Sequence, residues 1–128
     1  QPLSFIMLDI DHFKHINDTY GHPVGDTTLQ TLAKILAENL RKSDILGRYG
    51  GEEFLIICPE TNSAETALLA EKLRSCVENY TFSDINSMTI SMGVAEFKAT
   101  DTVKELLARS DQALYQAKHN GRNRVVIG

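Results

Sequence analysis

The sequence predicts an α/β (α+β) fold with a mixed central sheet flanked by helices. Its apolar runs follow the order strand, helix, strand, strand, helix, strand, helix, strand, and the hairpin in this order breaks the alternation of a purely parallel sheet. A length of 128 residues and a hydrophobic content of 42% are ordinary for one globular domain. We therefore expect a single domain over 1–128 with one core.

The first expected element is a strand over residues 5–10. Its residues are apolar on both faces, as in a central buried strand, until Asp9 interrupts the run. Asp9 is therefore expected at the mouth of the strand, where its carboxylate can face a ligand.

The connection that follows, from Asp9 to Asp26, is rich in polar residues and glycines, and we interpret it as a binding loop. Within it, Asn17 offers an amide and Asp26 a carboxylate, which together can satisfy the donor and acceptor edge of a guanine base. The alternative is that Asn17 makes a turn and Asp26 caps the next helix. That helix is predicted to continue to about Arg41, because apolar residues recur there at helical spacing.

A β-hairpin is predicted around Gly50 and Gly51, because a Gly-Gly pair readily takes the positive φ values of tight turns. Its strands are expected over 45–49 and 53–58. Glu52 and Glu53 follow the glycines and are placed at the hairpin tip. With Asp9 they could supply the hard oxygen ligands that Mg²⁺ takes when it also holds substrate phosphates. The alternative is a set of solvated acids at strand ends.

The last part of the chain is predicted from helical and strand periods. A helix is expected over 69–80, a strand over 88–95 and a final short strand over 125–127. Between these strands, a long helix begins at a capping box of Thr102 and Glu105 and ends at Gly121. Lys118 and Arg122 lie at its end, where they either reach triphosphate oxygens or only complement the helix dipole.

Charge and composition limit the partners. A net charge of -4 and a pI near 5.5 give no general attraction to nucleic acid or to an anionic membrane face, so contact with neither is expected. No apolar run approaches the roughly 20 residues that cross a bilayer. Cys58 and Cys76 lack the spacing of a metal site and are expected to be buried reduced thiols, which fits the cytoplasm. Because the chain opens at Gln1, without an initiator Met, and enters the apolar run at Phe5 almost at once, we expect a truncated piece of a longer protein.

Several separated motifs, read together, resemble the GGDEF domain of diguanylate cyclases over essentially the whole chain. They are Gly-Gly-Glu-Glu-Phe at 50–54 after Arg48-Tyr49, Asp-Ile-Asp-His-Phe-Lys-His-Ile-Asn at 9–17 with Gly21-His22 and Gly25-Asp26, and Tyr-Gln-Ala-Lys at 115–118 with Gly-Arg-Asn at 121–123. The resemblance implies the palm-like fold of nucleotidyl cyclases and polymerases. It also implies a bacterial signalling enzyme that condenses two GTP molecules into cyclic di-GMP and two pyrophosphates.

By this resemblance, two Mg²⁺ ions, or Mn²⁺ in their place, are held by Asp9, by the main-chain carbonyl of Ile10 and by Glu52, with Glu53 assisting. Glu52 is the candidate base for the attacking 3′-hydroxyl, although adjacent acids on a strand point to opposite faces, so the division of roles between Glu52 and Glu53 stays open. Asn17 and Asp26 would read guanine, and Lys118 and Arg122 would grip the β and γ phosphates. The expected substrate site also includes Phe13, Lys14, Gly50 and Gly51.

The resemblance also implies partners. Each site would hold one GTP, so catalysis requires a homodimer with facing sites, and an upstream sensor or receiver domain in the parent chain would control it. The parent could be membrane-anchored while this domain stays in the cytoplasm. Arg41 and Asp44 form an RxxD motif just before Gly50, which implies inhibition by bound cyclic di-GMP. Lys72 stands where some members place an arginine of this inhibitory site, and a lysine cannot reproduce the arginine fork.

Two alternatives remain at this stage. One is a GGDEF module that senses GTP or cyclic di-GMP without making product, although such members typically lose the acids that this chain retains. The other is a different enzyme on the same palm-like fold, which Asn17, Asp26 and the RxxD motif disfavour. The family segment Asp-x-Leu-Thr-Gly-Leu-x-Asn-Arg, usual before the first strand, is absent, and this adds to the expectation of truncation.

Overall fold

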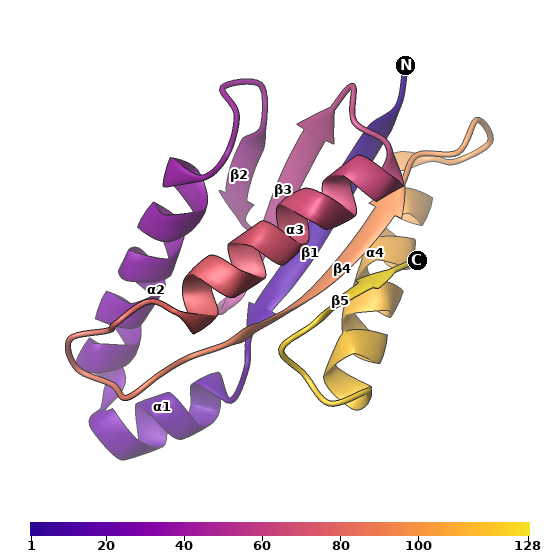
Figure 1. Cartoon of the computed structure of the whole chain (residues 1–128). Coiled ribbons are helices and arrows are strands. Elements are labelled where there is room, and N and C mark those ends of the chain that lie inside the picture. The colour runs from indigo at the N-terminus through magenta and orange to yellow at the C-terminus, as the bar shows by residue number, and fades with distance from the viewer.

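The computed structural model describes residues 1–128 and contains a five-stranded sheet with helices on both faces (Figure 1). The strands are β1 (Leu3–Ile10), β2 (Ile45–Arg48), β3 (Glu53–Pro59), β4 (Ile90–Glu96) and β5 (Val125–Ile127). Their order across the sheet is β2-β3-β1-β4-β5. The pair β4 and β5 is parallel and all other neighbours are antiparallel, which confirms the predicted mixed sheet.

Strand β1 lies at the centre of this sheet, as its apolar sequence predicts. It pairs with β3 on one side and with β4 on the other, and every residue from Ser4 to Ile10 is buried. A strand covered on both faces must be apolar on both faces, which is why the run lacks an alternating pattern. The end of β1 therefore delivers Asp9 from the middle of the sheet.

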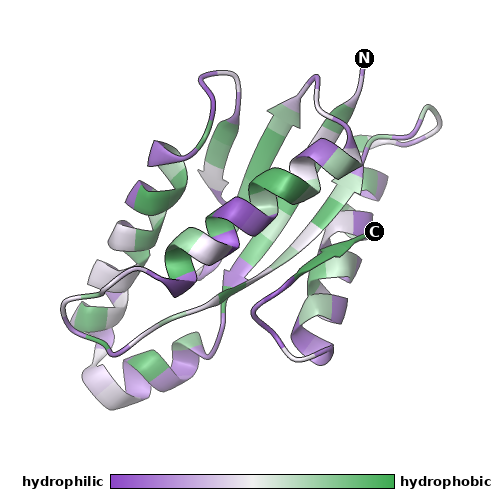
Figure 2. Ribbon diagram, viewed as in Figure 1, coloured by the Kyte–Doolittle hydropathy of each residue, from purple (hydrophilic) through white to green (hydrophobic).

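The helices are α1 (Phe13–Tyr20), α2 (His22–Glu38), α3 (Ser63–Glu78) and α4 (Val103–His119). Figure 1 shows α3 in front of the sheet, α2 beside the edge strand β2 and α4 behind the sheet. In Figure 2 the central strands are the most apolar segments, whereas the connecting loops are mostly polar. No helix combines the length and the apolar character that a membrane span requires.

The core is divided between the two faces of the sheet. The larger cluster holds 20 buried residues from the strands, α1, α2, α3 and the segment before β4. A smaller cluster of 3 buried residues, Phe5, Ala95 and Leu106, lies under α4. Helix α4 packs against β4 at Gly93, where an added Cβ would lie 2.3 Å from the backbone of Leu114 and of Ser110. A side chain at this glycine would push α4, and the residues at its end, away from the sheet.

The predicted binding loop from Asp9 to Asp26 is wrong over most of its length, because residues 13–20 form helix α1 and residues 22–26 belong to helix α2. Helix α1 is eight residues long and buries only Ile16, with Phe13 packed partly against the core, so its apolar stripe is too short to predict a helix. Helix α2 then begins at His22, with a proline in its first turn, and ends at Glu38 rather than near Arg41. Asp26 consequently lies inside α2, and the alternative that it only caps the helix is wrong.

Other boundaries shift by smaller amounts. Helix α3 begins earlier than predicted, at a capping box formed by Asn62 and Glu65. The capping box of Thr102 and Glu105 at the start of α4 is confirmed. Gly121, with φ 120°, follows the end of that helix as expected. Both cysteines are free, but Cys76 is only half-buried rather than buried.

Candidate functional site

Four segments meet at one end of the sheet and form the candidate site. They are the end of β1, the turn between β2 and β3, the helical pair α1 and α2, and the loop between α4 and β5 (Figure 1). Two adjoining cavities lie among them, one of about 180 Å³ and one of about 550 Å³. We call the smaller one the phosphate corner and the larger one the base pocket.

The phosphate corner brings the expected metal and phosphate residues together. It is lined by Asp9, Ile10, Asp11, His12, Phe13, Lys14, Glu52, Lys118 and Arg122. The residues come from sequence positions as far apart as 9 and 122, and antiparallel pairing of β1 with β3 explains part of the convergence. Of the residues expected to hold metal and phosphate, Asp9, Ile10, Glu52, Lys118 and Arg122 line this cavity and Glu53 does not.

Asp9 is the most buried acid of the phosphate corner, at 4% exposure. Its Oδ2 accepts a hydrogen bond from the ammonium of Lys118, while its Oδ1 has no hydrogen-bond partner. Burial raises the pKa of Asp9 above its usual value, and the hydrogen bond and charge of Lys118 oppose that rise. A buried carboxylate oxygen without a partner is costly, so this atom is ready to accept a ligand.

Glu52 lines both cavities, and its pKa is raised first by burial and then by the negative charge of Asp9. Such mutual destabilisation of two carboxylates would be relieved by a bound cation. Within the chain, however, no group of three or more His, Cys, Asp or Glu side chains is close enough to hold a metal by itself. Two carboxylates and a carbonyl fit Mg²⁺, which usually completes its shell with water and substrate phosphates.

Glu53 is the cross-strand partner of Asp9 but does not line the phosphate corner. It lines two other cavities, beside α4, together with Asp111. Its pKa is also raised, by burial first and then by Asp9 and Asp111. Glu52, at the end of the turn, and Glu53, the first residue of β3, thus line different cavities.

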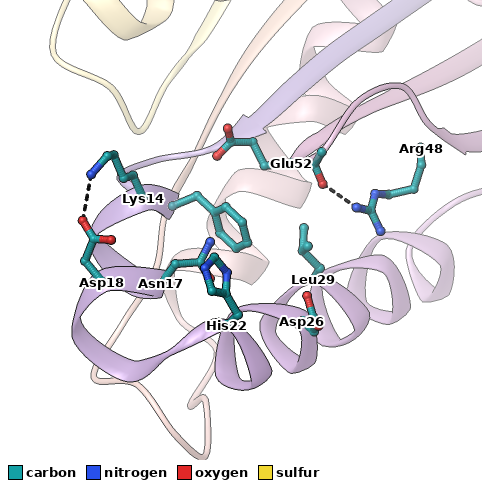
Figure 3. Close-up of a pocket in the computed structure, with 10 residues that line it drawn as sticks. Lys14, Asn17, Asp18, His22, Asp26, Leu29, Arg48 and Glu52 are labelled. Carbon is teal, nitrogen blue, oxygen red and sulfur yellow. Dashed lines mark hydrogen bonds and ion pairs between the residues drawn. The ribbon is translucent and has the colours of Figure 1, made fainter.

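The base pocket lies between the α1–α2 pair and the hairpin turn (Figure 3). It is lined by Phe13, Lys14, Asn17, Asp18, His22, Asp26, Leu29, Arg48, Gly51 and Glu52. Asn17 and Asp26, the expected guanine-binding residues, therefore share one cavity. The Oδ1 atom of Asn17 is buried without a hydrogen-bond partner, and so it is the second unsatisfied acceptor of the site.

The absence of a side chain at Gly25 leaves room for the side chain of Asn17 between α1 and α2. A Cβ at Gly25 would lie 1.8 Å from Oδ1 of Asn17 and 3.4 Å from the ring of Phe13. Only a glycine at this position of α2 lets the amide of α1 lie across it. Lys14 is mostly exposed and forms an ion pair of 2.9 Å with Asp18 at the rim.

The turn itself differs from the expectation, because neither Gly50 nor Gly51 has a positive φ. The turn is closed instead by hydrogen bonds from the amides of Tyr49 (2.9 Å) and Gly50 (3.3 Å) to the carbonyl of Glu53. Gly51 faces the base pocket with no atom within 4 Å of an added Cβ, whereas Gly50 lines none of the described cavities. At Gly51, therefore, the glycine leaves the backbone uncovered beside the cavity and is not needed for a left-handed conformation.

Sequence reasoning missed three contributors. His22 was named only as part of a motif, with no role, but lines the base pocket, and Asp11 was not singled out although it is buried in the phosphate corner. Arg48 donates hydrogen bonds to the carbonyls of Gly50 (3.4 Å) and Gly51 and lies 5.7 Å from the ring centroid of Phe54. Its position two residues before the glycines was the only local signal of this role.

The RxxD motif lies at the opposite end of β2 from the site. The guanidinium of Arg41 donates to Asp44 Oδ1 (2.9 Å), Thr61 Oγ1 (2.5 Å) and the carbonyl of Pro59 (3.3 Å). The hydrogen bond and charge of Asp44 raise the pKa of Arg41. Lys72 is exposed on α3 and forms no hydrogen bond or ion pair within the chain.

Comparison with known proteins gives one consistent family. The family model described as diguanylate cyclase, GGDEF domain, matches residues 1–124. Diguanylate cyclase A of Treponema denticola is 43% identical over 132 aligned positions, covering 99% of this chain and 35% of that protein. Diguanylate cyclase DgcM of Escherichia coli is 44% identical, covering 98% of this chain and 31% of that protein. The chain thus spans about a third of the length of these curated relatives.

Solved structures agree with the family match. The active GGEEF domain of a diguanylate cyclase from Vibrio cholerae superposes with a TM-score of 0.94 at 42% identity, covering 99% of this chain and 83% of that one. The GGDEF domain of DgcB from Caulobacter crescentus, solved in complex with c-di-GMP, superposes with a TM-score of 0.94 at 34% identity, covering 98% of this chain and 77% of that one.

Proposed function

Because this chain belongs to the GGDEF domain family of diguanylate cyclases, we propose that it condenses two GTP molecules into cyclic di-GMP and two pyrophosphates. The observation that carries the proposal is the pair of unsatisfied buried acceptors, Asp9 Oδ1 and Asn17 Oδ1. One lies in the phosphate corner and the other in the base pocket, and Glu52 lines both. A molecule with a phosphate end and a hydrogen-bonding base would satisfy both atoms at once.

In this proposal the base pocket recognises guanine. The Oδ1 atom of Asn17 accepts from an N–H of the base, and the carboxylate of Asp26 accepts from its N1 and N2 edge. Adenine presents a different pattern and would leave these acceptors unpaired, which is the physical reason for selectivity.

The phosphate corner would hold the metals and the triphosphate. Asp9, the Ile10 carbonyl and Glu52 are the residues that would bind Mg²⁺ or Mn²⁺. When bound, the metal supplies Lewis-acid stabilisation of charge on the α-phosphate and lowers the pKa of a coordinated hydroxyl. Lys118 and Arg122 would hold the β and γ phosphates, and the transfer of Lys118 from Asp9 to phosphate would free the second oxygen of Asp9 for the metal.

Glu52 is proposed as the base that accepts the proton of the attacking 3′-hydroxyl. The raised pKa of Glu52, caused by burial and by Asp9, moves it toward the range in which a carboxylate can accept a proton near neutral pH. Glu53 would assist through its charge from the position directly across the sheet from Asp9, since its own pKa responds to Asp9.

Assembly and regulation complete the proposal. Each site would hold one GTP, so two copies of the domain with facing sites are needed to join the two nucleotides. Arg41 and Asp44 would bind accumulated cyclic di-GMP and inhibit the enzyme, with Lys72 in the place of a second-subunit arginine. The greater length of the relatives supports a further sensor or receiver domain in the parent chain, which would control the pairing.

The test is incubation of the purified protein with GTP and Mg²⁺ at high protein concentration, followed by chromatography of the nucleotides. We expect cyclic di-GMP and pyrophosphate, and neither from the matched variant Glu52→Gln. Binding of cyclic di-GMP with GTP left intact by a protein shown to be dimeric would instead favour a sensing module.

A further inference from the structure

Asp11 is a buried carboxylate for which the proposed reaction has no use. It is 5% exposed, although it borders the phosphate corner. Its Oδ1 accepts from Ser91 Oγ (2.6 Å), and its Oδ2 accepts from Thr89 Oγ1 (2.7 Å) and from the main-chain amide of Asn123 (3.0 Å). With both oxygens engaged, Asp11 differs from Asp9 and is not placed to bind a metal or a phosphate.

The partner that matters is Asn123, because it belongs to a constrained loop. Gly121, Arg122 and Asn123 have φ values of 120°, 62° and 45°, so two residues with side chains adopt the left-handed conformation in succession. Side chains at such φ values are disfavoured, and the conformation persists only when other contacts hold it. The structure must therefore provide anchors for this loop.

The anchors are visible on each side of Arg122. Its own amide donates to the carbonyl of Ala117 (2.9 Å) in α4, and the next amide, of Asn123, donates to Asp11. The side chain of Asn123 is also held by α3, accepting from Arg74 (2.8 Å) and donating to Glu78 (2.7 Å). Among these anchors, only Asp11 lies at the phosphate corner and ties the loop to the strand that carries Asp9.

We infer that Asp11 is a positioning residue that holds the 121–123 loop so that Arg122 faces the phosphate corner. The inference rests on the proposed function and deepens it, because it assigns the recognition of the outer phosphates to an anchored loop. The carboxylate suits this task, since three donors converge on its two oxygens. An asparagine in its place would present an N–H₂ group to at least one of these donors.

Binding of the base serves as an internal control for binding of the outer phosphates. Asn17 and Asp26 come from α1 and α2 and form no hydrogen bond with the Asp11 cluster. Displacement of Arg122 should therefore weaken the binding of a triphosphate and spare the binding of the base. The two probes are 3′-deoxy-GTP, which cannot react because it lacks the attacking hydroxyl, and GMP, which lacks the β and γ phosphates.

The experiment measures both affinities by calorimetry in the presence of Mg²⁺ for the unaltered protein and for Asp11→Asn. We expect the preference for 3′-deoxy-GTP over GMP to fall by about tenfold in the variant, with GMP affinity within about twofold, since the amide of Asn123 loses its charged acceptor and the hydroxyls around Asp11 must rearrange. An unchanged preference, or an equal loss for both nucleotides, would show that Asp11 supports the fold only.

A double-mutant cycle identifies the residue through which Asp11 acts. In an Arg122→Ala background, Asp11→Asn should add less than about twofold to the loss of preference, because the group that it positions is already gone. Full additivity would overturn the inference. If Asp11→Asn does not fold, Thr89→Val removes one donor from the same Oδ2 atom and should lower the preference in the same direction by a smaller factor; no fall in that variant would count against the inference.

The role of Asp11 and the proposed reaction are tested by different measurements. Formation of cyclic di-GMP from GTP by the unaltered protein tests the reaction, whereas the affinities of two unreactive nucleotides test the loop. A protein that prefers 3′-deoxy-GTP over GMP, loses this preference on Asp11→Asn and yet makes no product would support the positioning role and overturn the reaction.

Discussion

The two ends of the central sheet each hold an acid and a base, and the two pairs differ in how fully they satisfy each other. At the site, Asp9 pairs with Lys118 through one oxygen and leaves the other without a partner. At the far end, Asp44 accepts from the Arg41 guanidinium on Oδ1 (2.9 Å) and from the Arg41 amide on Oδ2 (2.9 Å), and its side chain is 0% exposed.

This difference indicates how each end should respond to a ligand. An unsatisfied buried acceptor is costly in the free protein, so a ligand that satisfies it gains the full benefit of the new contact. At the far end, a ligand must first break hydrogen bonds between Arg41 and Asp44, and the free energy of breaking them reduces its affinity. We therefore expect the substrate end to respond strongly to single substitutions and the RxxD end to act only once product has accumulated.

The largest effect is expected for Glu52→Gln, which keeps the shape of the site and removes a charge shared by both cavities. Formation of cyclic di-GMP should fall by about 1,000-fold, as for loss of one central electrostatic contributor to catalysis. Glu53→Gln is the matched control, because it changes the same chemistry at the next residue, which lines neither the phosphate corner nor the base pocket, and it should reduce the rate less. Equal losses in the two variants would contradict the assignment of the base to Glu52.

The next largest effect is expected at Gly25, where a methyl group would displace the second unsatisfied acceptor. In Gly25→Ala the added Cβ would meet Asn17 Oδ1 at 1.8 Å, so the amide must leave the base pocket. GTP affinity should fall by about 30-fold, as for the loss of one or two buried hydrogen bonds. Gly47→Ala is the control, since nothing lies within 4 Å of its added Cβ and it should change affinity by less than about twofold. Calorimetry with 3′-deoxy-GTP measures both.

A smaller effect is expected on the thermal stability, because the neighbouring carboxylates of Asp9 and Glu52 destabilise the folded protein without metal. Burial and Asp9 raise the pKa of Glu52 in the folded state, so the stability that this group contributes is present below its unfolded pKa and is lost as the pH rises through the folded pKa. Without metal at pH 7, Glu52→Gln should therefore raise the Tm, by about 2 °C. The gain should vanish at a pH low enough to protonate Glu52 in both states. A lower Tm for the variant at pH 7 would contradict this sign.

The smallest effect on the initial rate is expected at the far end. Arg41→Ala leaves both cavities intact, so the initial rate should stay within about twofold of that of the unaltered protein. Inhibition should be relieved, with the cyclic di-GMP concentration for half-inhibition rising more than about tenfold, since Arg41 would supply the fork that binds guanine. Inhibition that persists unchanged would remove the RxxD motif from the regulatory site.

Much of the fold could be predicted because its signals are local. The apolar run of β1, the hairpin around the glycines and the capping box of α4 are each encoded within a few neighbouring residues. Helix α1 could not be predicted in this way, because it buries a single side chain and has no side-chain cap. Its helical form depends on packing against α2 and on the groups around the base pocket.

Periodicity and motif spacing are properties of short segments, and they were enough to predict the mixed sheet, the residue types of the site and the order of all elements except α1. Which polar atoms remain without a partner, in contrast, depends on the folded molecule. Asp9 meets Lys118 across 109 positions and Asp11 meets Asn123 across 112, so one acid keeps a free oxygen while its near neighbour has none. Such satisfaction depends on the three-dimensional positions of distant donors, which no local pattern specifies.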